Sequence, residues 1–446
     1  MPIHDTMKCI FCFHTLKNTD ICFETVDDQV DPTPDPIKLN FQRRTEPYMD
    51  EFDMQAMSRQ PICQYQEGST EFELDPETGI PVAWNQSVQE STYTLKSRKR
   101  ICAFCHMPLP SQFGKRPNMM VGFCGNTGAG KTVYMLSLIH DLKSRVHGMA
   151  VAPDPIFYSQ LKTDYKSMYD AMYGGEDGYR LPQATPPNDT LSPLVLNCSY
   201  RGRDFMITLY DMAGEGTKHA SYMAKQALFL ANTAGVIYLK DPDYFPGMPM
   251  ANVALEEHAY LDDLFDAITS RRQDTQPAYI AITMTKIDKL LDIYGGNREF
   301  RSIIGATFDR DDVNIHADGF DAPAARAISG RMHKLYDWSN TEDQAILGIY
   351  NKQLSRADRE DTVRSGLFGR LFSGKKKRKD EEDTGNQPVM LFGASPLGRN
   401  PGLYHEEGDD STYYASQEPR GLHNVDPILW LLYCHGLFPA RRTVED

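Results

Sequence analysis

The feature that most constrains this chain is an eight-residue motif between a short apolar run and a helical pattern. The motif consists of Gly125, Asn126, Thr127, Gly128, Ala129, Gly130, Lys131 and Thr132. It matches G-x-x-x-x-G-K-[ST] at every fixed position. The apolar residues 119–124 predict a buried strand before it, and residues 131–147 carry apolar side chains at helical spacing after it. A strand, a glycine-rich turn and a helix in this order predict a phosphate-binding loop, or P-loop.

Each fixed position of a P-loop has a chemical task. Glycines let the main-chain N–H groups curl around phosphate oxygens, and the N-terminus of the following helix adds partial positive charge. The motif predicts that Lys131 neutralises the β- and γ-phosphates and that the Thr132 hydroxyl is a ligand of Mg²⁺. A glycine-rich turn without a ligand is the alternative, and the complete match in this context disfavours it.

The pattern after residue 117 predicts an α/β fold. Short apolar runs alternate with helical patterns, which is typical of a mostly parallel sheet with helices on both faces. Further strands are expected at residues 193–200, 205–211, 235–240, 278–284 and 389–392, the first two forming an antiparallel hairpin. Helices are expected at the apolar stripe of Leu261, Leu264, Phe265 and Ile268 and over residues 426–437.

Residues 290–388 are too many for an ordinary crossover between strands. Helical patterns near residues 322–338 and 344–354 indicate an inserted helical subdomain. Within it, the basic residues 375–379 are followed at once by the acidic residues 380–383. This predicts a solvated, self-neutralising loop rather than a nuclear-localisation or lipid-binding patch.

A second motif follows Thr132 after 79 positions, at the end of a predicted strand. It is Asp211-Met212-Ala213-Gly214. A carboxylate at the strand end can hold the metal through water, so Asp211 is expected on the Mg²⁺ side, and Gly214 can offer its N–H to the γ-phosphate. An ordinary turn at a strand end is the alternative.

A third motif, Thr285-Lys286-Ile287-Asp288, follows the strand expected at residues 278–284 directly. Its carboxylate can accept two hydrogen bonds from the N1–H and N2–H₂ edge of guanine, while the lysine stem packs over the base. Adenine lacks this donor pair and would leave the carboxylate unpaired. The motif therefore predicts guanine recognition, against a helix cap with a surface aspartate. The triplet Gly393-Ala394-Ser395 after the last strand could touch guanine O6 through backbone N–H groups.

These motifs, in this order, resemble the Ras-like GTPases. With cysteine pairs upstream and a long insertion before the last strand, the chain resembles the bacterial double-GTPase family more than small Ras proteins. The resemblance covers about residues 118–438 and is carried by about 20 of them. It implies a three-layer α/β sandwich, GTP or GDP with Mg²⁺ as ligands, and a switch that signals to effector or regulatory proteins of a multi-component bacterial system.

Two positions depart from the family pattern. Thr285 stands where asparagine is usual, which weakens the expected contacts to the base. Glu215 follows Gly214 where Ras-like proteins place the glutamine that orients the attacking water. We therefore expect hydrolysis that is slow or needs a partner.

The family also requires a switch-one threonine between Thr132 and Asp211. We expect Thr185, which lies in a segment rich in proline and threonine before the hairpin; Thr190 is the competing candidate. Arg180 or Arg201 could serve as an internal arginine finger, although an ordinary surface arginine is the default interpretation.

Two Cys-x-x-Cys pairs lie far apart in the chain, Cys9/Cys12 and Cys102/Cys105. Each has phenylalanine before its second cysteine and leucine four residues after it, at Leu16 and Leu109, so they look like two copies of one knuckle. Four thiolates from two such turns suit a tetrahedral structural Zn²⁺, and the shared phenylalanine and leucine side chains are expected to pack beside the metal. The 89 residues between the pairs would have to loop out. Buried free cysteines are the alternative, and a redox pair fits less well because neither pair opens a helix after a strand.

Other residues near the knuckles are spare ligand candidates or core residues. The spare candidates are Cys22, Cys63, His14 and His106. Cys124 and Cys198 lie in predicted strands, so we expect them in the core.

Two domains are expected: a zinc-ribbon-like region over residues 1–116, with a long insertion at 23–98, and a Ras-like P-loop domain over 117–440. The net charge of −14 works against broad binding to nucleic acid or anionic lipid. The start lacks the pattern of a secretory signal, and no run approaches 18 apolar residues, so a cytoplasmic protein without a transmembrane segment is expected.

Three functions fit these observations. The leading hypothesis is a GTP-hydrolysing molecular switch. A P-loop ATPase is the first rival, and a nucleotide-loaded scaffold with little or no hydrolysis is the second.

Overall fold

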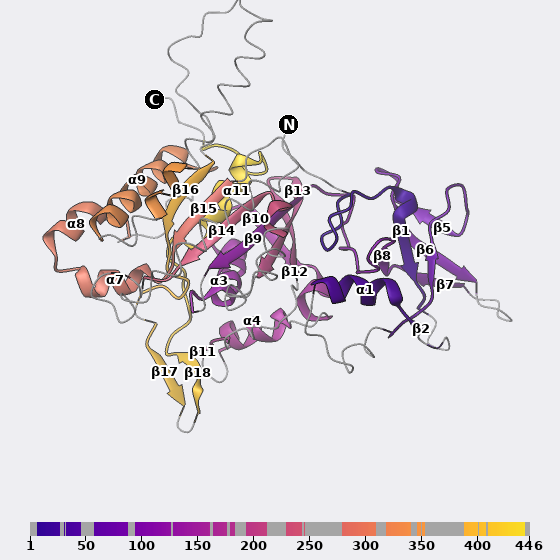
Figure 1. Cartoon of the computed structure of the whole chain (residues 1–446), viewed down its shortest axis with the longest axis horizontal. Helices are drawn as coiled ribbons and strands as arrows, with labels where there is room; N and C mark the ends of the chain where they lie inside the picture. The colour runs from indigo at the N-terminus through magenta and orange to yellow at the C-terminus, as the bar shows by residue number, and fades with distance from the viewer. Residues whose placement is uncertain are drawn as a thin grey trace, which may run out of the picture.

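The structure is a computed structural model of the whole chain, drawn in Figure 1. It describes residues 7–26, 31, 33–45, 58–87, 94–125, 128–160, 164–175, 179–182, 193–211, 229–242, 245, 279–308, 318–339, 346–348, 350–352, 388–399, 401–406 and 409–441.

A seven-stranded sheet forms the centre of the molecule, in the order β10-β12-β13-β9-β14-β15-β16. Its strands are β9 (Asn118–Gly125), β10 (Met149–Pro153), β12 (Pro193–Tyr200), β13 (Arg203–Asp211), β14 (Gly235–Lys240), β15 (Tyr279–Met284) and β16 (Val389–Gly393). The strands from β13 to β16 run parallel, while β12 and β10 add an antiparallel edge. The expected mixed α/β architecture with a mostly parallel sheet is confirmed, as is the β12–β13 hairpin.

The central strands are long apolar runs because both of their faces are buried. Every residue of β9, β14 and β15 is buried, as is typical of parallel strands with helices on both faces. Alternate side chains enter different cores. Met119, Val121 and Phe123 face one core, and Met120 and Cys124 face the other.

Helices cover the two faces of the sheet (Figure 1). One core contains apolar side chains of α3 (Lys131–Ser144) and α11 (Asp426–Cys434). The other contains those of α7 (Ile287–Tyr294), α8 (Arg298–Ile304) and α9 (Ala322–Trp338). The last two lie within the expected helical insertion, whose residues 346–348 and 350–352 are also helical.

The order in which the chain forms the strands makes the carboxyl end of β9 a candidate ligand-binding position. After β9 the chain reaches β13 on one side of it and then β14 on the other side. Ligands of open α/β sheets bind outside the carboxyl ends of the strands at such a point of divergence. Gly125, the last residue of β9, lies there.

The N-terminal region is built mainly of short strands. One sheet has the order β4-β1-β8 and another β5-β6-β7, beside the pair β2-β3. The elements are η1 (Asn18–Asp20), β1 (Ile21–Glu24), β2 (Thr33–Pro34), α1 (Pro36–Thr45), β3 (Ser58–Arg59), β4 (Ile62–Gln64), β5 (Phe72–Leu74), β6 (Pro81–Ser87), β7 (Thr94–Ser97) and β8 (Arg100–Cys102). The sequence shows little periodicity here because most of these strands have only two to four residues.

A hairpin of β17 (Leu403–Glu406) and β18 (Asp409–Ala415) projects from the rest of the molecule (Figure 1). It forms a three-stranded sheet with β11 (Tyr179–Arg180). This sheet, η2 (Ile156–Gln160) and α4 (Tyr165–Tyr173) were not expected from the sequence. In the part of the chain that the structure describes, every helix is too short or too polar to cross a membrane.

Candidate nucleotide and metal sites

The P-loop joins β9 to α3, as its motif predicts. Gly125 has φ 145°, and a Cβ atom there would lie 2.2 Å from the carbonyl oxygen of Leu239, so only glycine fits. Gly128 and Gly130 also have positive φ angles, of 85° and 77°. The Lys131 ammonium is buried and donates to the Gly125 carbonyl at 2.9 Å. Asn126 and Thr127 lie outside the described residues.

Asp211 and Thr132 are brought together by the parallel pairing of β13 with β9. Asp211 ends β13 and is paired in register with Phe123. The Thr132 hydroxyl donates to a carboxylate oxygen of Asp211 at 2.8 Å. A hydroxyl and a carboxylate at this separation are an oxygen donor set suited to Mg²⁺.

The third motif also contacts the P-loop. The Thr285 hydroxyl donates to the carbonyl of Ala129 at 3.1 Å, and the Lys286 ammonium donates to the carbonyl of Gly128 at 2.8 Å. Lys286 also pairs with the buried carboxylate of Asp241 at 2.5 Å. Asp241 follows β14 and was not singled out in the sequence, because one aspartate after a strand carries no recognisable spacing.

Asp288 lies at the first turn of α7, beside the loop after β16. The Ser395 hydroxyl donates to its carboxylate. Burial raises the pKa of Asp288 above its ordinary value, although the bond from Ser395 opposes this. The backbone N–H groups of Ala394 and Ser395 donate to the carbonyls of Met284 and Leu422. This loop therefore contacts the third motif through the Ser395 side chain and through the Ala394 carbonyl, which accepts from the Ile287 N–H at 3.1 Å.

Several predicted site residues lie outside the described residues: Thr185, its competitor Thr190, Gly214 and Glu215. Arg201 is described, and its position is incompatible with the arginine-finger role. It forms the turn between β12 and β13, at the opposite end of β13 from Asp211, and pairs with Asp318. Arg180 lies in β11 and is exposed, in keeping with the default interpretation.

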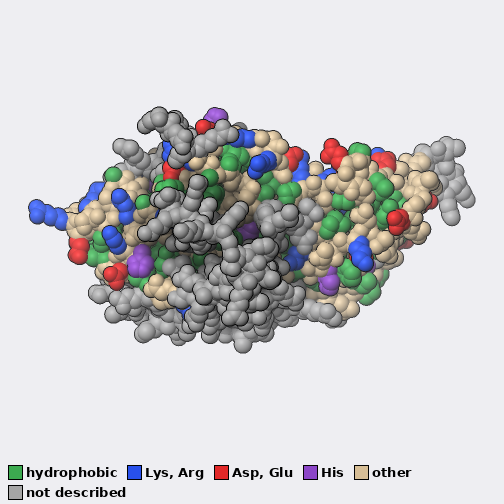
Figure 2. Space-filling view, turned by 90° about the horizontal axis from the view of Figure 1, so that it is seen from above, with side chains coloured by type: hydrophobic (Ala, Val, Ile, Leu, Met, Phe, Trp, Pro, Cys, Tyr) green, Lys and Arg blue, Asp and Glu red, His purple; other side chains and the backbone are tan. Residues whose placement is uncertain are grey.

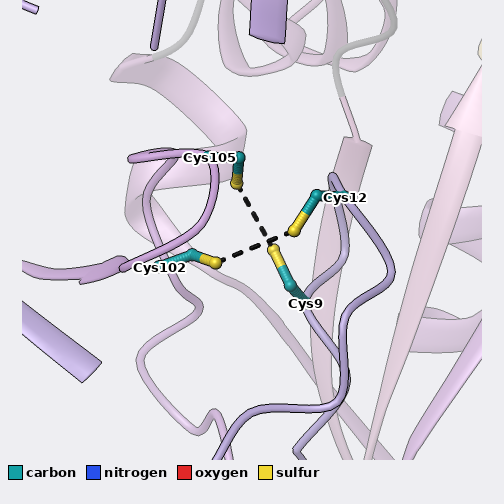
Figure 3. Close-up of side chains that lie close together, drawn as sticks. All are labelled: Cys9, Cys12, Cys102 and Cys105. Atoms are coloured by element: carbon teal, nitrogen blue, oxygen red, sulfur yellow. Dashed lines mark hydrogen bonds between the residues drawn. The ribbon is translucent and has the colours of Figure 1, made fainter. Parts of the chain in front are cut away.

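The four paired cysteines converge on one point, as Figure 3 shows. Their sulfur atoms all lie within 4.8 Å of one another. Cys9 and Cys105 are 3.7 Å apart at sulfur, as are Cys12 and Cys102. Tetrahedral zinc with bonds of about 2.3 Å requires sulfur atoms about 3.8 Å apart. The cluster therefore fits a zinc ion, and its spacing is far too long for disulfides.

The two knuckles share one backbone form. In each, the residue after the second cysteine has a positive φ, 60° at Phe13 and 53° at His106. Its N–H donates to the carbonyl of the first cysteine, at 3.0 Å and 2.8 Å. Strands β1 and β8 bring the two pairs together although they lie far apart in sequence, because their antiparallel register places Ile21 opposite Cys102.

The predicted packing beside the cluster is correct for three of the four residues. Leu16, Leu109 and Phe11 are buried. Phe104 is 48% exposed and stacks on the His14 ring instead. On the face shown in Figure 2, hydrophobic and charged side chains of the described residues are interspersed.

The spare ligand candidates have other neighbours. Cys22 and Cys63 lie in β1 and β4, and the ring of His106 bonds to the buried carboxylate of Asp35 at 3.0 Å. Cys124 and Cys198 are core residues as expected, and burial raises the pKa of the Cys124 thiol to about 12.

The thiols of the cluster differ in acidity. Burial raises the pKa of the Cys9 thiol, whereas the hydrogen bond with Cys102 lowers that of Cys12. A metal ion requires thiolates, so its binding displaces the remaining protons.

No protein-family model matches the chain, and no curated protein matches it. Among solved structures, a crystal structure of a bacterial selenocysteine-specific elongation factor is similar over 43% of this chain and 24% of that chain, at 12% identity and a TM-score of 0.22. A crystal structure of a protein from Thermus thermophilus is similar over 42% of this chain and 22% of that chain, at 15% identity and a TM-score of 0.21. This chain thus spans under a quarter of the length of each of these two proteins.

Proposed function

We propose that this chain is a guanine-nucleotide-binding switch that takes up GTP with Mg²⁺ and hydrolyses it to GDP and phosphate. One observation carries the proposal: hydrogen bonds join the P-loop to both other motifs. Thr132 contacts Asp211, and Lys286 contacts the Gly128 carbonyl. These segments lie far apart in sequence and meet at the divergence point of the sheet.

The residues of the loop have complementary roles. Glycines with positive φ present main-chain N–H groups to phosphate oxygens, and Lys131 supplies a cation. Thr132 would hold Mg²⁺ directly, and Asp211 would hold it through water. When bound, Mg²⁺ neutralises charge on the β- and γ-phosphates.

We assign base selection to Asp288. Its carboxylate has lost part of its hydration through burial, which raises its pKa. A guanine edge replaces that hydration with two donors, whereas adenine does not. Thr285 supports this site by bonding to the P-loop, and Asp241 and the Gly128 carbonyl hold the Lys286 ammonium.

Hydrolysis and switching involve the segments on either side of β12 and β13. We assign Gly214 and Thr185 to contacts that depend on the γ-phosphate, with Thr190 as the alternative to Thr185. Glu215 would replace the usual glutamine, and its charge opposes the γ-phosphate. We therefore expect a slow intrinsic rate, which a Glu215→Gln variant should raise.

We further propose that residues 117–440 form a Ras-like domain of the bacterial double-GTPase type. Residues 1–116 would form a zinc-ribbon-like region whose Cys9, Cys12, Cys102 and Cys105 hold one structural Zn²⁺. The central strand order and the sulfur spacing support this division. The partners would be effector or regulatory proteins that read the nucleotide state.

Nucleotide binding and turnover test the proposal together. Fluorescent GTP and ATP analogues are titrated into the full chain with Mg²⁺, followed by single-turnover hydrolysis. We expect GTP to bind at least about tenfold tighter than ATP, and Asp288→Asn to shift preference from guanine towards xanthine nucleotides. The matched control is Asp292→Asn, an exposed aspartate on the same helix.

Each rival has its own result. ATP preference that Asp288→Asn leaves unchanged would identify an ATPase. Tight GTP binding with turnover near zero, in wild type and in Glu215→Gln alike, would identify a nucleotide-loaded scaffold. An absence of binding to either nucleotide would end the proposal.

A further inference from the structure

The four-cysteine cluster lies directly on the sheet that carries Asp211. The Tyr210 hydroxyl donates to the carbonyl of Ile10 at 2.7 Å. Ile10 lies inside the first knuckle, between Cys9 and Cys12, and is fully buried. Tyr210 is itself 1% exposed. A buried hydrogen bond thus joins the backbone of the metal knuckle to a side chain at the carboxyl end of β13.

An aromatic contact reinforces this bond. The Phe13 ring, one residue after Cys12, meets the Phe229 ring edge to face, with centroids 5.0 Å apart. It also lies 6.3 Å from the ring of Tyr210. Phe229 is the first described residue after Asp211. The first knuckle therefore contacts residues on both sides of the segment that contains Gly214 and Glu215.

Tyr210 and Asp211 are neighbours on one strand, and successive side chains of a strand point to opposite faces. Tyr210 is directed to the knuckle, and Asp211 accepts the hydrogen bond from Thr132 of the P-loop. Both residues are held by the ladder to β9, where they pair with Gly122 and Phe123. A shift of this strand end would change both contacts at once.

We propose that Tyr210 is a positioning residue that couples the two sites, so that metal binding by the four cysteines tightens Mg²⁺·nucleotide binding, and the reverse. The proposal rests on the function proposed above. A folded, metal-bound knuckle holds the Ile10 carbonyl in place, which fixes Tyr210 and with it the position of Asp211. Coupling between two binding sites is reciprocal, and its usual size is about 5- to 150-fold in affinity.

The test measures each affinity with and without the other ligand, using the full chain stripped of metal under reducing conditions. Co²⁺ is the metal probe, because its thiolate absorption bands report binding to the cysteines alone. Mg²⁺·GDP is the nucleotide probe, because it is not consumed. In wild type we expect saturating Mg²⁺·GDP to tighten Co²⁺ binding at least about fivefold.

The deciding variant is Tyr210→Phe, which keeps the ring and removes the donor to Ile10. We expect it to bind both probes with a mutual effect below about twofold. The matched control is Tyr200→Phe in β12. Tyr200 is equally buried, and its hydroxyl has no hydrogen-bond partner among the described residues. This control should retain the wild-type coupling.

A second measurement separates this inference from the proposed function. Amide hydrogen exchange at residues 205–211 is followed with and without Zn²⁺, in the absence of nucleotide. Slower exchange with Zn²⁺ in wild type, and a smaller effect in Tyr210→Phe, would support the link even if the chain bound no nucleotide.

Equal protection in wild type and Tyr210→Phe would overturn the inference, even with GTP binding intact. So would two probes that bind wild type independently, or a cluster that binds neither Co²⁺ nor Zn²⁺.

Discussion

The four-cysteine cluster and the nucleotide site are assembled in opposite ways. In the cluster, the four sulfur atoms already point at one another with the spacing of a tetrahedral metal site. In the nucleotide site, the groups assigned to the phosphates and Mg²⁺ bond to protein partners: Lys131 to Gly125 and Thr132 to Asp211. A ligand there must exchange those bonds for its own. The first arrangement suits a permanent ion, and the second suits a ligand that comes and goes.

Removing the cluster should have the largest effect. In the double variant Cys9→Ser with Cys102→Ser, we expect zinc to fall from about one per chain to near zero, because one ligand is lost from each knuckle. Thermal unfolding should begin several degrees lower, since structural metal binding contributes directly to folding. Elemental analysis and calorimetry measure both effects. Cys63→Ser, outside the cluster, is the control, and equal zinc in the double variant would disprove the site.

The Lys131→Ala variant should impair the nucleotide site and leave the four-cysteine cluster intact. We expect nucleotide affinity to fall by about 2 kcal/mol or more, roughly 30-fold, because the phosphates lose their buried cation. Zinc content should stay at the wild-type level. Titration with a fluorescent GTP analogue measures the change, and Lys143→Ala, exposed on the same helix, is the control. Unchanged binding and turnover in Lys131→Ala would refute the P-loop assignment.

Ser395→Ala should have a smaller effect on the same site. The variant removes the hydrogen bond that orients Asp288. We expect GTP affinity to fall by about 1 kcal/mol, roughly fivefold, with ATP affinity unchanged. Ser302→Ala, which removes an exposed hydroxyl from α8, should leave both affinities at the wild-type level. An equal loss for GTP and ATP would show that Ser395 acts on folding rather than on the base.

The smallest expected effect is a pH dependence. Guanine requires the Asp288 carboxylate, and burial raises the pKa of this group. GTP affinity should therefore fall on acidification at a pH above the ordinary aspartate value of about 3.9. The contribution of Asp288 to folding has the opposite sign: it is favourable below that value and is lost as the pH rises through the raised pKa.

Profiles of GTP affinity from about pH 8 down to the ordinary aspartate value of about 3.9 measure this effect. Asp292 raises the pKa of Asp288 through its charge. The Asp292→Asn variant should therefore move the fall in GTP affinity to lower pH. Asp288→Asn should abolish it. A fall that is identical in all three proteins would belong to another group.

The sequence predicts those parts of the fold that are specified by local pattern. The strand before Gly125, the helix after Gly130 and the hairpin at Arg201-Gly202 each depend on neighbouring residues, and each is confirmed. The sequence did not predict β10, an edge strand that pairs with β12, or the β17–β18 hairpin, in which β18 also pairs with the distant β11.

In the candidate sites, too, the parts specified by local sequence patterns could be predicted and the long-range contacts could not. The repeated spacing around Cys9 and Cys102 predicts a four-cysteine cluster, which the structure brings together. The contacts of Tyr210 with Ile10 and of Asp241 with Lys286 join residues 200 and 45 positions apart. No local pattern encodes them, since only the folded sheet brings these residues together.

The antiparallel pairing of β1 with β8 places both ends of the intervening chain side by side. The free-energy cost of closing a flexible loop rises by only about 0.6 kcal/mol for each doubling of its length. The long stretch from Thr25 to Lys99 can therefore separate the two knuckles in sequence at a small cost in loop-closure free energy.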